Sequence, residues 1–447
     1  MAQTLLRRTG GVLLLLVAAV LGLAAAVAGF LGAAVATASI PLLVTAALAA
    51  LFGVTFLTAW PGYALYGVVR RRRAAVVSAG VLAVLVAALS GVTVLRPMAR
   101  PADQAVPPDV HFWNLPTGSR IAYREAAATG PAHPAPVIFL HGGPGTANDD
   151  ISEVGRALAT DGFDVYSYDQ VGSGRSSRLR DVTQYTDARQ VADLDAIRRT
   201  IGAERIILVG QSWGGSLAAH YMAAHPDRVA KAVLSSPGVL WYGAFPDGET
   251  GELFDRLTPD AKRRFDSLTS SPRMIALALL QQVNPEAAHH LVGDREADQR
   301  FREILTASLP AAQCPGRPPA SLPDNRTGFY VNQFTIDDAE HLPDPRPRLR
   351  AAHVPTLIMR GECDYKKWEV TYDYKRTLPD STLVYVPGAG HAIAIDRPAI
   401  YQAALRAFLL DRPLPLPPYT AATPPDTAAG QPAESTGQRT PTASDGR

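Results

Sequence analysis

The sequence predicts a domain of the α/β class, in which a mostly parallel sheet is covered by helices on both faces. From about residue 110 onward, short apolar runs alternate with stretches of helical length. One of these runs, residues 206–209, leads directly into Gly-x-Ser-x-Gly and then into a helical stretch, which indicates a sharp strand–turn–helix unit. An uncharged apolar region precedes the whole domain and predicts membrane helices.

The first element in order is this apolar region. Residues 9–69 contain no charged side chain, and Pro41 marks a natural break because proline disrupts a helix interior. Such a length accommodates two spans of about 20 residues each, and a further uncharged run covers residues 74–95. We therefore expect three transmembrane helices near residues 11–36, 42–68 and 74–95, which make residues 1–95 a membrane anchor in the lipid bilayer.

Basic residues predict the orientation of this anchor. Arg7 and Arg8 precede the first helix, and the arginines at 70–73 separate the second from the third. The positive-inside rule places both groups in the cytoplasm, so the rest of the chain is expected on the extracytoplasmic side of the cell membrane. A cleaved signal peptide is the competing interpretation of the first run, whose apolar stretch exceeds the about 7–15 residues of such peptides. Because the spans contain no ionisable Asp, Glu, Lys, Arg or His, a transport path has no support.

After the anchor, a linker precedes the catalytic core. Four prolines within residues 96–109 predict a stiff, extended segment. A hairpin is expected where Pro116-Thr117-Gly118-Ser119 separates two short runs. We expect strands at 111–114, 120–125, 137–140, 165–168, 206–209, 232–235, 356–359 and 382–386, and helices at 154–160, 191–201 and 400–410. Residues 110–242 and 350–410 form the predicted core.

The alternation of strands and helices stops between residues 243 and 349. This stretch contains helical segments such as 251–257 and 274–283, followed by Pro-rich sequence. An insertion at this point predicts a helical lid over the carboxyl ends of the strands, where such sheets bind ligands. Residues 411–447 are rich in Pro, Thr and Ala with few large apolar side chains, and we expect a disordered tail.

Ser212 is the candidate nucleophile. A Gly-x-Ser-x-Gly match is common by chance, and an ordinary loop serine is the alternative, but a strand before and a helix after favour the nucleophile. Side chains at Gly210 and Gly214 would collide with the neighbouring helix and strand. The helix N-terminus also supplies free N–H groups and partial positive charge where an oxyanion would form.

A serine hydroxyl needs a base, itself oriented by a carboxylate. Of ten histidines, His391 is favoured because Gly388-Ala389-Gly390-His391 follows the last predicted strand, at the sheet edge that presents Ser212. Glu362 and Asp364 both lie in the loop after strand 356–359, and the residues alone leave the choice between them open. Either acid gives the chain order serine, acid, histidine that this kind of fold uses.

The predicted oxyanion hole consists of two backbone N–H groups. One belongs to Trp213, directly after the nucleophile, and the other to Gly143 in the loop that follows strand 137–140. His141 precedes this loop, and we expect it to bond the backbone rather than transfer protons.

Composition limits the partners of the domain. The formal net charge of +2 gives no bulk attraction to nucleic acid, so we expect no nucleic-acid partner. Cys314 and Cys363 are the only cysteines, too few for a Cys-type metal site, and we expect neither metal nor cofactor. A disulfide between lid and acid loop, or two unpaired thiols, are both compatible with the sequence.

Four stretches together resemble the proline iminopeptidase family of α/β-hydrolases, the S33 group of serine peptidases. They are His-Gly-Gly-Pro-Gly at 141–145, Tyr-Asp-Gln-Val-Gly-Ser-Gly-Arg-Ser at 168–176, Gly-Gln-Ser-Trp-Gly-Gly at 210–215, and the loop pair 361–364 and 388–391. The resemblance covers roughly residues 110–410 and implies an α/β-hydrolase fold with a mostly parallel eight-stranded sheet.

The resemblance also implies roles for residues. Ser212 corresponds to the nucleophile, His391 to the base, and Asp364 to the acid, because the family's acid closes a Gly-x-x-Asp loop. Gly143 and Trp213 correspond to the oxyanion donors.

Two departures from the family pattern bear on the substrate. Val171 stands where the peptidases usually have arginine. The family also binds the substrate's α-amino group with acidic lid residues; Glu249 and Glu252, beside Asp247, are the candidates, with solvated acids at a helix start as the alternative. We expect a membrane-anchored serine aminopeptidase that cleaves N-terminal residues from short peptides. A carboxylesterase or lipase-like hydrolase of the same fold, with an ester substrate, is the alternative, and the complete triad disfavours a non-catalytic binding domain.

Overall fold

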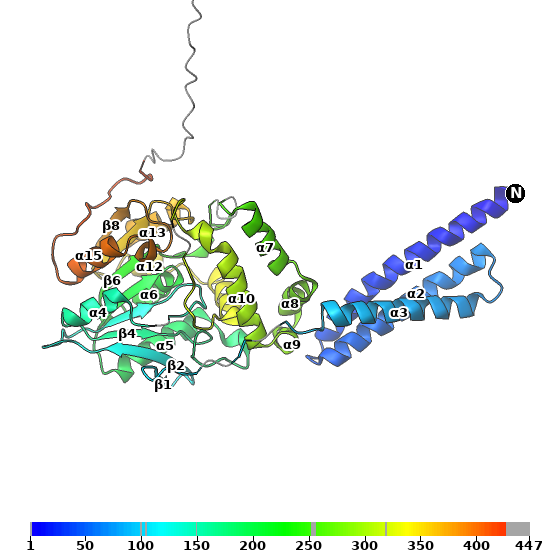
Figure 1. Cartoon of the computed structure of the whole chain (residues 1–447), viewed down its shortest axis with the longest axis horizontal. Coiled ribbons are helices and arrows are strands. Elements are labelled where there is room, and N and C mark those ends of the chain that lie inside the picture. The colour runs from blue at the N-terminus through cyan, green and yellow to red at the C-terminus, as the bar shows by residue number, and fades with distance from the viewer. Residues whose placement is uncertain are drawn as a thin grey trace, which may run out of the picture.

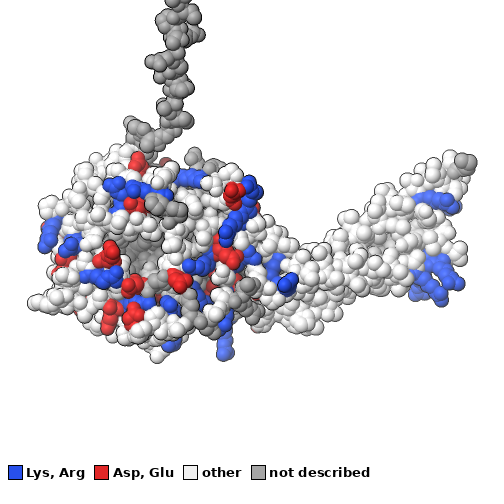
Figure 2. Space-filling view, viewed as in Figure 1, with Lys and Arg blue, Asp and Glu red and all other residues white. Residues whose placement is uncertain are grey.

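A computed structural model describes residues 2–98, 101–102, 105–148, 150–251, 256–317 and 320–425 of the chain. Three N-terminal helices extend as a bundle from one side of a larger α/β part (Figure 1): α1 (Ala2–Ala34), α2 (Ile40–Tyr66) and α3 (Arg71–Thr93). Each is long and apolar enough to cross a membrane. Arginine side chains gather at the end of the bundle that lies far from the α/β part (Figure 2).

Small residues allow α1 and α2 to pack closely. A side chain at Gly22 would come within 2.0 Å of Thr55 Oγ1, and one at Gly29 within 2.9 Å of the Ala46 carbonyl oxygen. Glycines at such contacts are typical of helices that associate within lipid, where the hydrophobic effect does not drive packing. Pro41 lies in the first turn of α2, where its missing N–H costs no hydrogen bond.

The α/β part contains one eight-stranded sheet, as predicted. Its strand order is β1-β2-β4-β3-β5-β6-β7-β8, with the pairs β1–β2 and β2–β4 antiparallel and the others parallel. The bounds of the strands are β1 (His111–Asn114), β2 (Arg120–Ala126), β3 (Val137–Leu140), β4 (Val165–Tyr168), β5 (Ile206–Gln211), β6 (Val229–Ser235), β7 (Thr356–Gly361) and β8 (Ser381–Val386). Every predicted strand is present, within three residues at each end.

Alternate residues of the parallel strands face opposite layers of helices. In β5, Ile206 and Leu208 belong to one apolar cluster, and Ile207 and Val209 belong to another on the opposite face. The first cluster includes side chains of α5 (Asp187–Thr200), α6 (Trp213–Ala224) and α13 (Trp368–Thr377). The second includes side chains of α4 (Glu153–Thr160) and α15 (Pro398–Leu409). Burial on both faces explains why β5 is a continuous apolar run.

Helices fill the chain between β6 and β7, in the region expected to form a lid. The longer ones are α7 (Pro259–Thr269), α8 (Pro272–Val283), α9 (Pro285–Leu291), α10 (Asp294–Ser308) and α11 (Phe329–Glu340), and a short α12 (Arg346–Leu349) ends the insertion. Helix α8 agrees with the helix predicted at 274–283. Most of the helix predicted at 251–257 lies outside the described residues, and its described ends are not helical.

The chain after residue 410 differs from the disordered tail that we expected. Residues 411–425 are described and pack against the core: the Tyr419 N–H donates to the Leu383 carbonyl at 2.7 Å, and Trp368 Nε1 donates to the Ala422 carbonyl at 2.7 Å. Leu414 and Leu416 also join an apolar cluster of the core. These few apolar and aromatic side chains were sufficient to hold the segment, and residues 426–447 lie outside the described residues.

Candidate active site

Ser212 occupies the turn between β5 and α6 in a strained backbone conformation, with φ 52° and ψ −121°. Neither neighbouring glycine could carry a side chain. A Cβ at Gly210 would lie 2.3 Å from the Gly214 carbonyl oxygen, and one at Gly214 would lie 2.1 Å from the Leu140 carbonyl oxygen. These contacts confirm why the sequence requires glycine on both sides of the serine.

A cavity of about 400 Å³ lies over this turn. Ser212, His391, Gly142 and Gly143 line it from the core. Its covering wall comes from the helical insertion and comprises Leu305, Ser308, Leu309, Ala312, Ser321, Leu322 and Pro323. Apolar side chains predominate in this wall, as is usual for a pocket that binds a small molecule.

His391, which lines the same cavity as Ser212, forms a hydrogen-bonded pair with Asp364. Nδ1 of His391 lies 2.8 Å from Oδ1 of Asp364, and both side chains are buried. The other ring nitrogen, Nε2, is buried and has no hydrogen-bond partner among the described residues. With Nδ1–H donating to the carboxylate, the Nε2 lone pair is the one available to accept a proton.

Asp364 also faces a buried arginine. Arg360 Nη1 lies 3.4 Å from Asp364 Oδ2, and the guanidinium donates to the Lys366 carbonyl at 2.7 Å. Burial would raise the pKa of Asp364, but the charge and hydrogen bond of His391, together with the charge of Arg360, hold the pKa of this carboxyl well below its ordinary value of 3.8. Asp364 is therefore a carboxylate across the physiological range.

A second buried histidine–aspartate pair differs in one decisive respect. His220 Nδ1 lies 2.7 Å from Asp187 Oδ1, but His220 Nε2 also bonds the Leu240 carbonyl at 3.1 Å. With both ring nitrogens occupied, His220 is not placed to accept a proton from a substrate or nucleophile. Burial lowers the pKa of His220, but the charge and hydrogen bond of Asp187, together with the bond to the Leu240 carbonyl, raise the pKa overall.

The predicted oxyanion donors are the backbone N–H groups of Gly143, in the loop after β3, and of Trp213, at the start of α6; Gly143 lines the cavity. Neither Gly143 N–H nor Trp213 N–H donates a hydrogen bond to another group among the described residues. Gly143 adopts φ +111°, and a Cβ there would lie 2.6 Å from the Gly145 nitrogen, so the loop requires glycine at this position. Both N–H groups are thus without a partner among the described residues, and their binding of an oxyanion stays a prediction.

His141 supports this loop from below. Its Nδ1 bonds the Gly142 carbonyl at 3.0 Å, and its Nε2 accepts the Gln170 N–H at 3.0 Å. Complete burial lowers the pKa of His141 to about 4. His141 is thus a neutral imidazole with both ring nitrogens hydrogen-bonded to the backbone, which is the structural role expected from the sequence.

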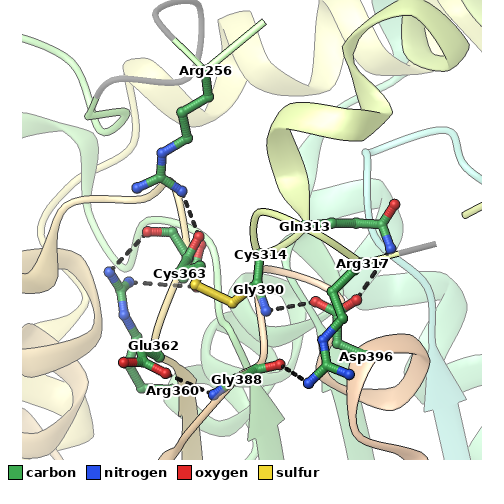
Figure 3. The surroundings of a disulfide bond; sticks show 11 residues. Arg256, Gln313, Cys314, Arg317, Arg360, Glu362, Cys363, Gly388, Gly390 and Asp396 are labelled. Carbon is green, nitrogen blue, oxygen red and sulfur yellow. Dashed lines mark hydrogen bonds and ion pairs between the residues drawn. A yellow bond between two sulfur atoms is a disulfide. The ribbon is translucent and has the colours of Figure 1, made fainter. Parts of the chain in front are cut away.

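The helical insertion is fastened to both loops that carry the pair. A disulfide joins Cys314 to Cys363, the residue before Asp364 (Figure 3). The His391 N–H donates to the Ala312 carbonyl at 2.8 Å, and Arg317 Nη2 donates to the Gly388 carbonyl at 2.7 Å. The wall of the cavity and the histidine–aspartate pair therefore form one connected unit.

Of the acidic residues suggested for substrate binding, the two that the structure describes, Asp247 and Glu249, do not line the cavity. Glu249 forms an ion pair with the buried Lys366 ammonium and is not among the residues that line the cavity. Glu252 lies outside the described residues. Asp247 contributes its carbonyl oxygen to Lys367 Nζ, at 3.3 Å. Val171, at the position where the peptidases usually have arginine, is fully buried in the core.

Sequence reasoning did not identify three features of the site. Arg360 behind the acid had a signal, since it is a charged residue at the end of an otherwise apolar strand. Tyr365, whose ring centroid lies 4.6 Å from that of His391, directly follows the acid. The apolar wall from the insertion had no signal, because which faces of its helices point inward depends on tertiary packing.

Comparisons with known proteins agree with this architecture. A family model described as the alpha/beta hydrolase fold matches residues 135–398. The proline iminopeptidase of Lactobacillus delbrueckii subsp. bulgaricus is 29% identical over 284 residues, which cover 62% of this chain and 90% of that protein. That of Xylella fastidiosa strain Temecula1 is 26% identical over 295 residues, covering 59% and 85%. The predicted likeness to proline iminopeptidases is thus confirmed.

Among solved structures, the proline iminopeptidase of Mycobacterium smegmatis superposes with a TM-score of 0.46 at 22% identity, covering 68% of this chain and 98% of that one. An esterase from Exiguobacterium antarcticum gives a TM-score of 0.46 at 20% identity, covering 67% and 98%.

Proposed function

Because the chain belongs to the alpha/beta hydrolase fold family, we propose that it is a serine hydrolase with Ser212 as nucleophile, His391 as base and Asp364 as acid. One observation carries this proposal. In a cavity that Ser212 lines, a buried histidine has one nitrogen bonded to a carboxylate and the other nitrogen free.

The proposed reaction proceeds through an acyl-enzyme. Ser212 Oγ attacks the carbonyl carbon of the substrate while His391 Nε2 accepts the hydroxyl proton, and the Asp364 carboxylate stabilises the imidazolium. The N–H groups of Gly143 and Trp213 bind the oxyanion of the tetrahedral intermediate. His391 then donates its proton to the leaving group. In the second half-reaction a water molecule, deprotonated by His391, releases the acyl group and restores Ser212.

For the substrate, we favour N-terminal residues of short peptides, cleaved by an aminopeptidase of the proline iminopeptidase type. The sequence relatives named above and the four stretches that resemble this family support this choice. Carboxylic esters are the second candidate. Two observations favour them: the cavity wall is largely apolar, and Glu249, suggested for the substrate amine, is already paired with Lys366.

We further propose that α1, α2 and α3 anchor the enzyme in the cell membrane with the hydrolase part outside the cytoplasm. Arg70 directly precedes α3 and Arg71–Arg73 form its first turn, at the end of the bundle remote from the hydrolase part, and the positive-inside rule assigns that end to the cytoplasm. The Cys314–Cys363 disulfide supports the same orientation, because disulfides persist outside the reducing cytoplasm.

A fluorophosphonate probe tests the nucleophile. The full-length chain in detergent should be labelled, and Ser212→Ala should not. Ser216→Ala, which removes a buried hydroxyl from the first turns of α6, is the matched control and should be labelled like the unmodified chain. Equal labelling of Ser212→Ala, or no labelling of the unmodified chain, would refute the proposed chemistry.

Two substrate classes then distinguish the candidates. Prolyl and other aminoacyl arylamides report peptidase activity, and short-chain p-nitrophenyl esters report esterase activity. Rapid ester turnover with every arylamide inert would exclude the peptidase.

A further inference from the structure

Exposed apolar side chains of the hydrolase part concentrate on one helix. Beyond the three N-terminal helices, the exposed large hydrophobic residues among those described are Val106, Ile275, Leu279, Val283 and Ile395. Three of these lie on α8 at intervals of four residues and therefore form one stripe. Their exposed fractions are 49%, 44% and 37%, respectively.

Helix α8 is apolar on both of its faces. Met274, Leu277 and Leu280 are buried on one side and belong to the core cluster. The other exposed side chains of α8 are Pro272, Ala278 and Gln282, so its exposed face carries no charge. A helix that is apolar all round belongs in a protein core or in contact with lipid, and an exposed apolar stripe marks an interaction surface.

Both ends of α8 are bonded to the N-terminal helices. At its start, Arg273 Nη1 donates to the carbonyl of Val94, the residue directly after α3. Just after its end, Asn284 Nδ2 donates to the carbonyl of Ala34, the last residue of α1, at 2.7 Å. These bonds place α8 against the ends of two membrane-type helices, where Figure 1 shows it between the bundle and the hydrolase part.

A buried ion pair makes the first attachment rigid. Both oxygens of Glu296 accept from the Arg273 guanidinium, and Glu296 Oε1 also accepts the Met98 N–H at 3.1 Å. Arg273 and Glu296 are almost fully buried. The chain that leaves α3 is therefore bonded at Val94 to α8 and at Met98 to α10.

The length of α3 gives the depth of α8 in a membrane. Helix α3 begins at Arg71 in the arginine cluster and has 23 residues. At about 1.5 Å per residue it spans roughly 34 Å, slightly more than the hydrocarbon core of about 30 Å. With the arginines at the cytoplasmic membrane surface, Val94 reaches the opposite boundary of the hydrocarbon core. Helix α8, which is bonded to Val94, then lies at that boundary.

We propose that α8 is an interfacial helix whose stripe of Ile275, Leu279 and Val283 lies in the headgroup–acyl boundary of the outer leaflet. This inference rests on the membrane anchoring proposed above. An uncharged, apolar helix face at this depth fits lipid, and it continues the contact that the three N-terminal helices already make. The helical insertion over the catalytic cavity is then seated directly on the membrane surface.

Site-directed spin labelling tests this placement in the full chain, reconstituted in phosphatidylcholine nanodiscs. Ile275→Cys, Leu279→Cys and Val283→Cys are labelled one at a time, because the disulfide occupies both native cysteines. Thr160→Cys, at the exposed end of α4 on the side remote from the bundle, is the control. For each label, the ratio of its collision rate with oxygen to its collision rate with a water-soluble nickel chelate is measured. This ratio should be several-fold higher for the three α8 labels than for the control label.

A measurement on the unmodified chain removes any dependence on these variants. A phosphatidylcholine with a diazirine in its acyl chain should crosslink to the tryptic peptide 274–295. Three outcomes would overturn the proposal. The α8 labels could behave like the control label, they could be shielded from both reagents as in contact with a second copy, or the crosslink could be absent. Carbonate extraction separates the two levels: extracted protein refutes the anchor itself, whereas retained protein with water-exposed labels refutes only the interfacial helix.

Discussion

His391 Nδ1 lies 2.8 Å from Asp364 Oδ1, and this bond joins two loops that follow neighbouring parallel strands, β7 and β8. The adjacent strand ends bring the two residues together although the chain separates them by 27 positions. With Nδ1–H donating to the carboxylate, the bond fixes the imidazole tautomer and leaves on Nε2 the lone pair that the proposed base needs.

Replacing Asp364 with asparagine should therefore abolish most activity without unfolding the protein. An amide that donates to Nδ1 stabilises the wrong tautomer, and losses of roughly 10⁴-fold in kcat are typical of that change. Rates of fluorophosphonate labelling and of ester or arylamide turnover measure the effect. Glu362→Gln is the control, since glutamine can still accept the Gly388 N–H that Glu362 now accepts at 2.7 Å. An equal loss in Glu362→Gln would contradict the assignment of the acid.

His141 should make the protein less stable in mild acid. The pKa of His141 is lowered from 6.5 to about 4 by burial, so the unfolded chain binds the extra proton first. The stabilisation is complete above pH 6.5 and disappears as the pH falls toward 4; it amounts to about 3 kcal/mol at one site. Thermal unfolding of the full chain in detergent between pH 7.5 and 4.5 measures this loss.

The matched variants separate His141 from other acid effects. His141→Gln should have a lower Tm at pH 7.5 and a shallower decline toward acid. His353→Gln, with a side chain that is 73% exposed, should follow the unmodified chain. Parallel pH curves for His141→Gln and the unmodified chain would show that His141 does not titrate as inferred.

Gly214→Ala tests the packing of the serine turn. The added methyl group would lie 2.1 Å from the Leu140 carbonyl oxygen. Because that oxygen belongs to the backbone, the overlap can be relieved only if β3 or α6 moves. Overpacking of this kind costs about 1–3 kcal/mol or more, and the displaced oxyanion loop should reduce fluorophosphonate labelling as well. Gly293→Ala, where nothing lies within 4 Å, is the control for Tm. A Gly214→Ala variant with normal Tm and labelling would contradict the geometry.

The sheet and the serine turn were predictable because their signals are local. Each parallel strand buries both faces and so appears as an apolar run. Gly210 and Gly214 identify the turn because a side chain at either position would collide with the backbone. The order of strands and loops along the chain then placed His391 on the edge that presents Ser212. Selecting Asp364 over Glu362 required the family resemblance, since both acids lie in one loop.

The insertion was less predictable because its helices are specified by contacts distant in sequence. The apolar segment at 274–283 indicated a helix, but not which face of α8 stays exposed. That depends on Arg273 and Asn284 reaching Val94 and Ala34, far earlier in the chain. Glu249 likewise has no partner nearby in the sequence, and only the folded chain places Lys366 beside it.

The Cys314–Cys363 disulfide should stabilise both the fold and the active geometry. It closes a loop with a sequence separation of 49 residues, and the loss of chain entropy in the unfolded state corresponds to roughly 4 kcal/mol. The double variant Cys314→Ser, Cys363→Ser should therefore have a clearly lower Tm. Its activity should fall as well, because Cys363 adjoins Asp364, while the His391 N–H bond to Ala312 still retains part of the contact.

Reductant provides the internal control for this prediction. Dithiothreitol should lower the Tm of the unmodified chain toward that of the double variant and leave the double variant unchanged. Thiol blocking before and after reduction, followed by gel electrophoresis, shows whether the bond is present. If the unmodified chain has two free thiols and reductant does not alter its Tm, then the loop that carries Asp364 is held by its hydrogen bonds alone.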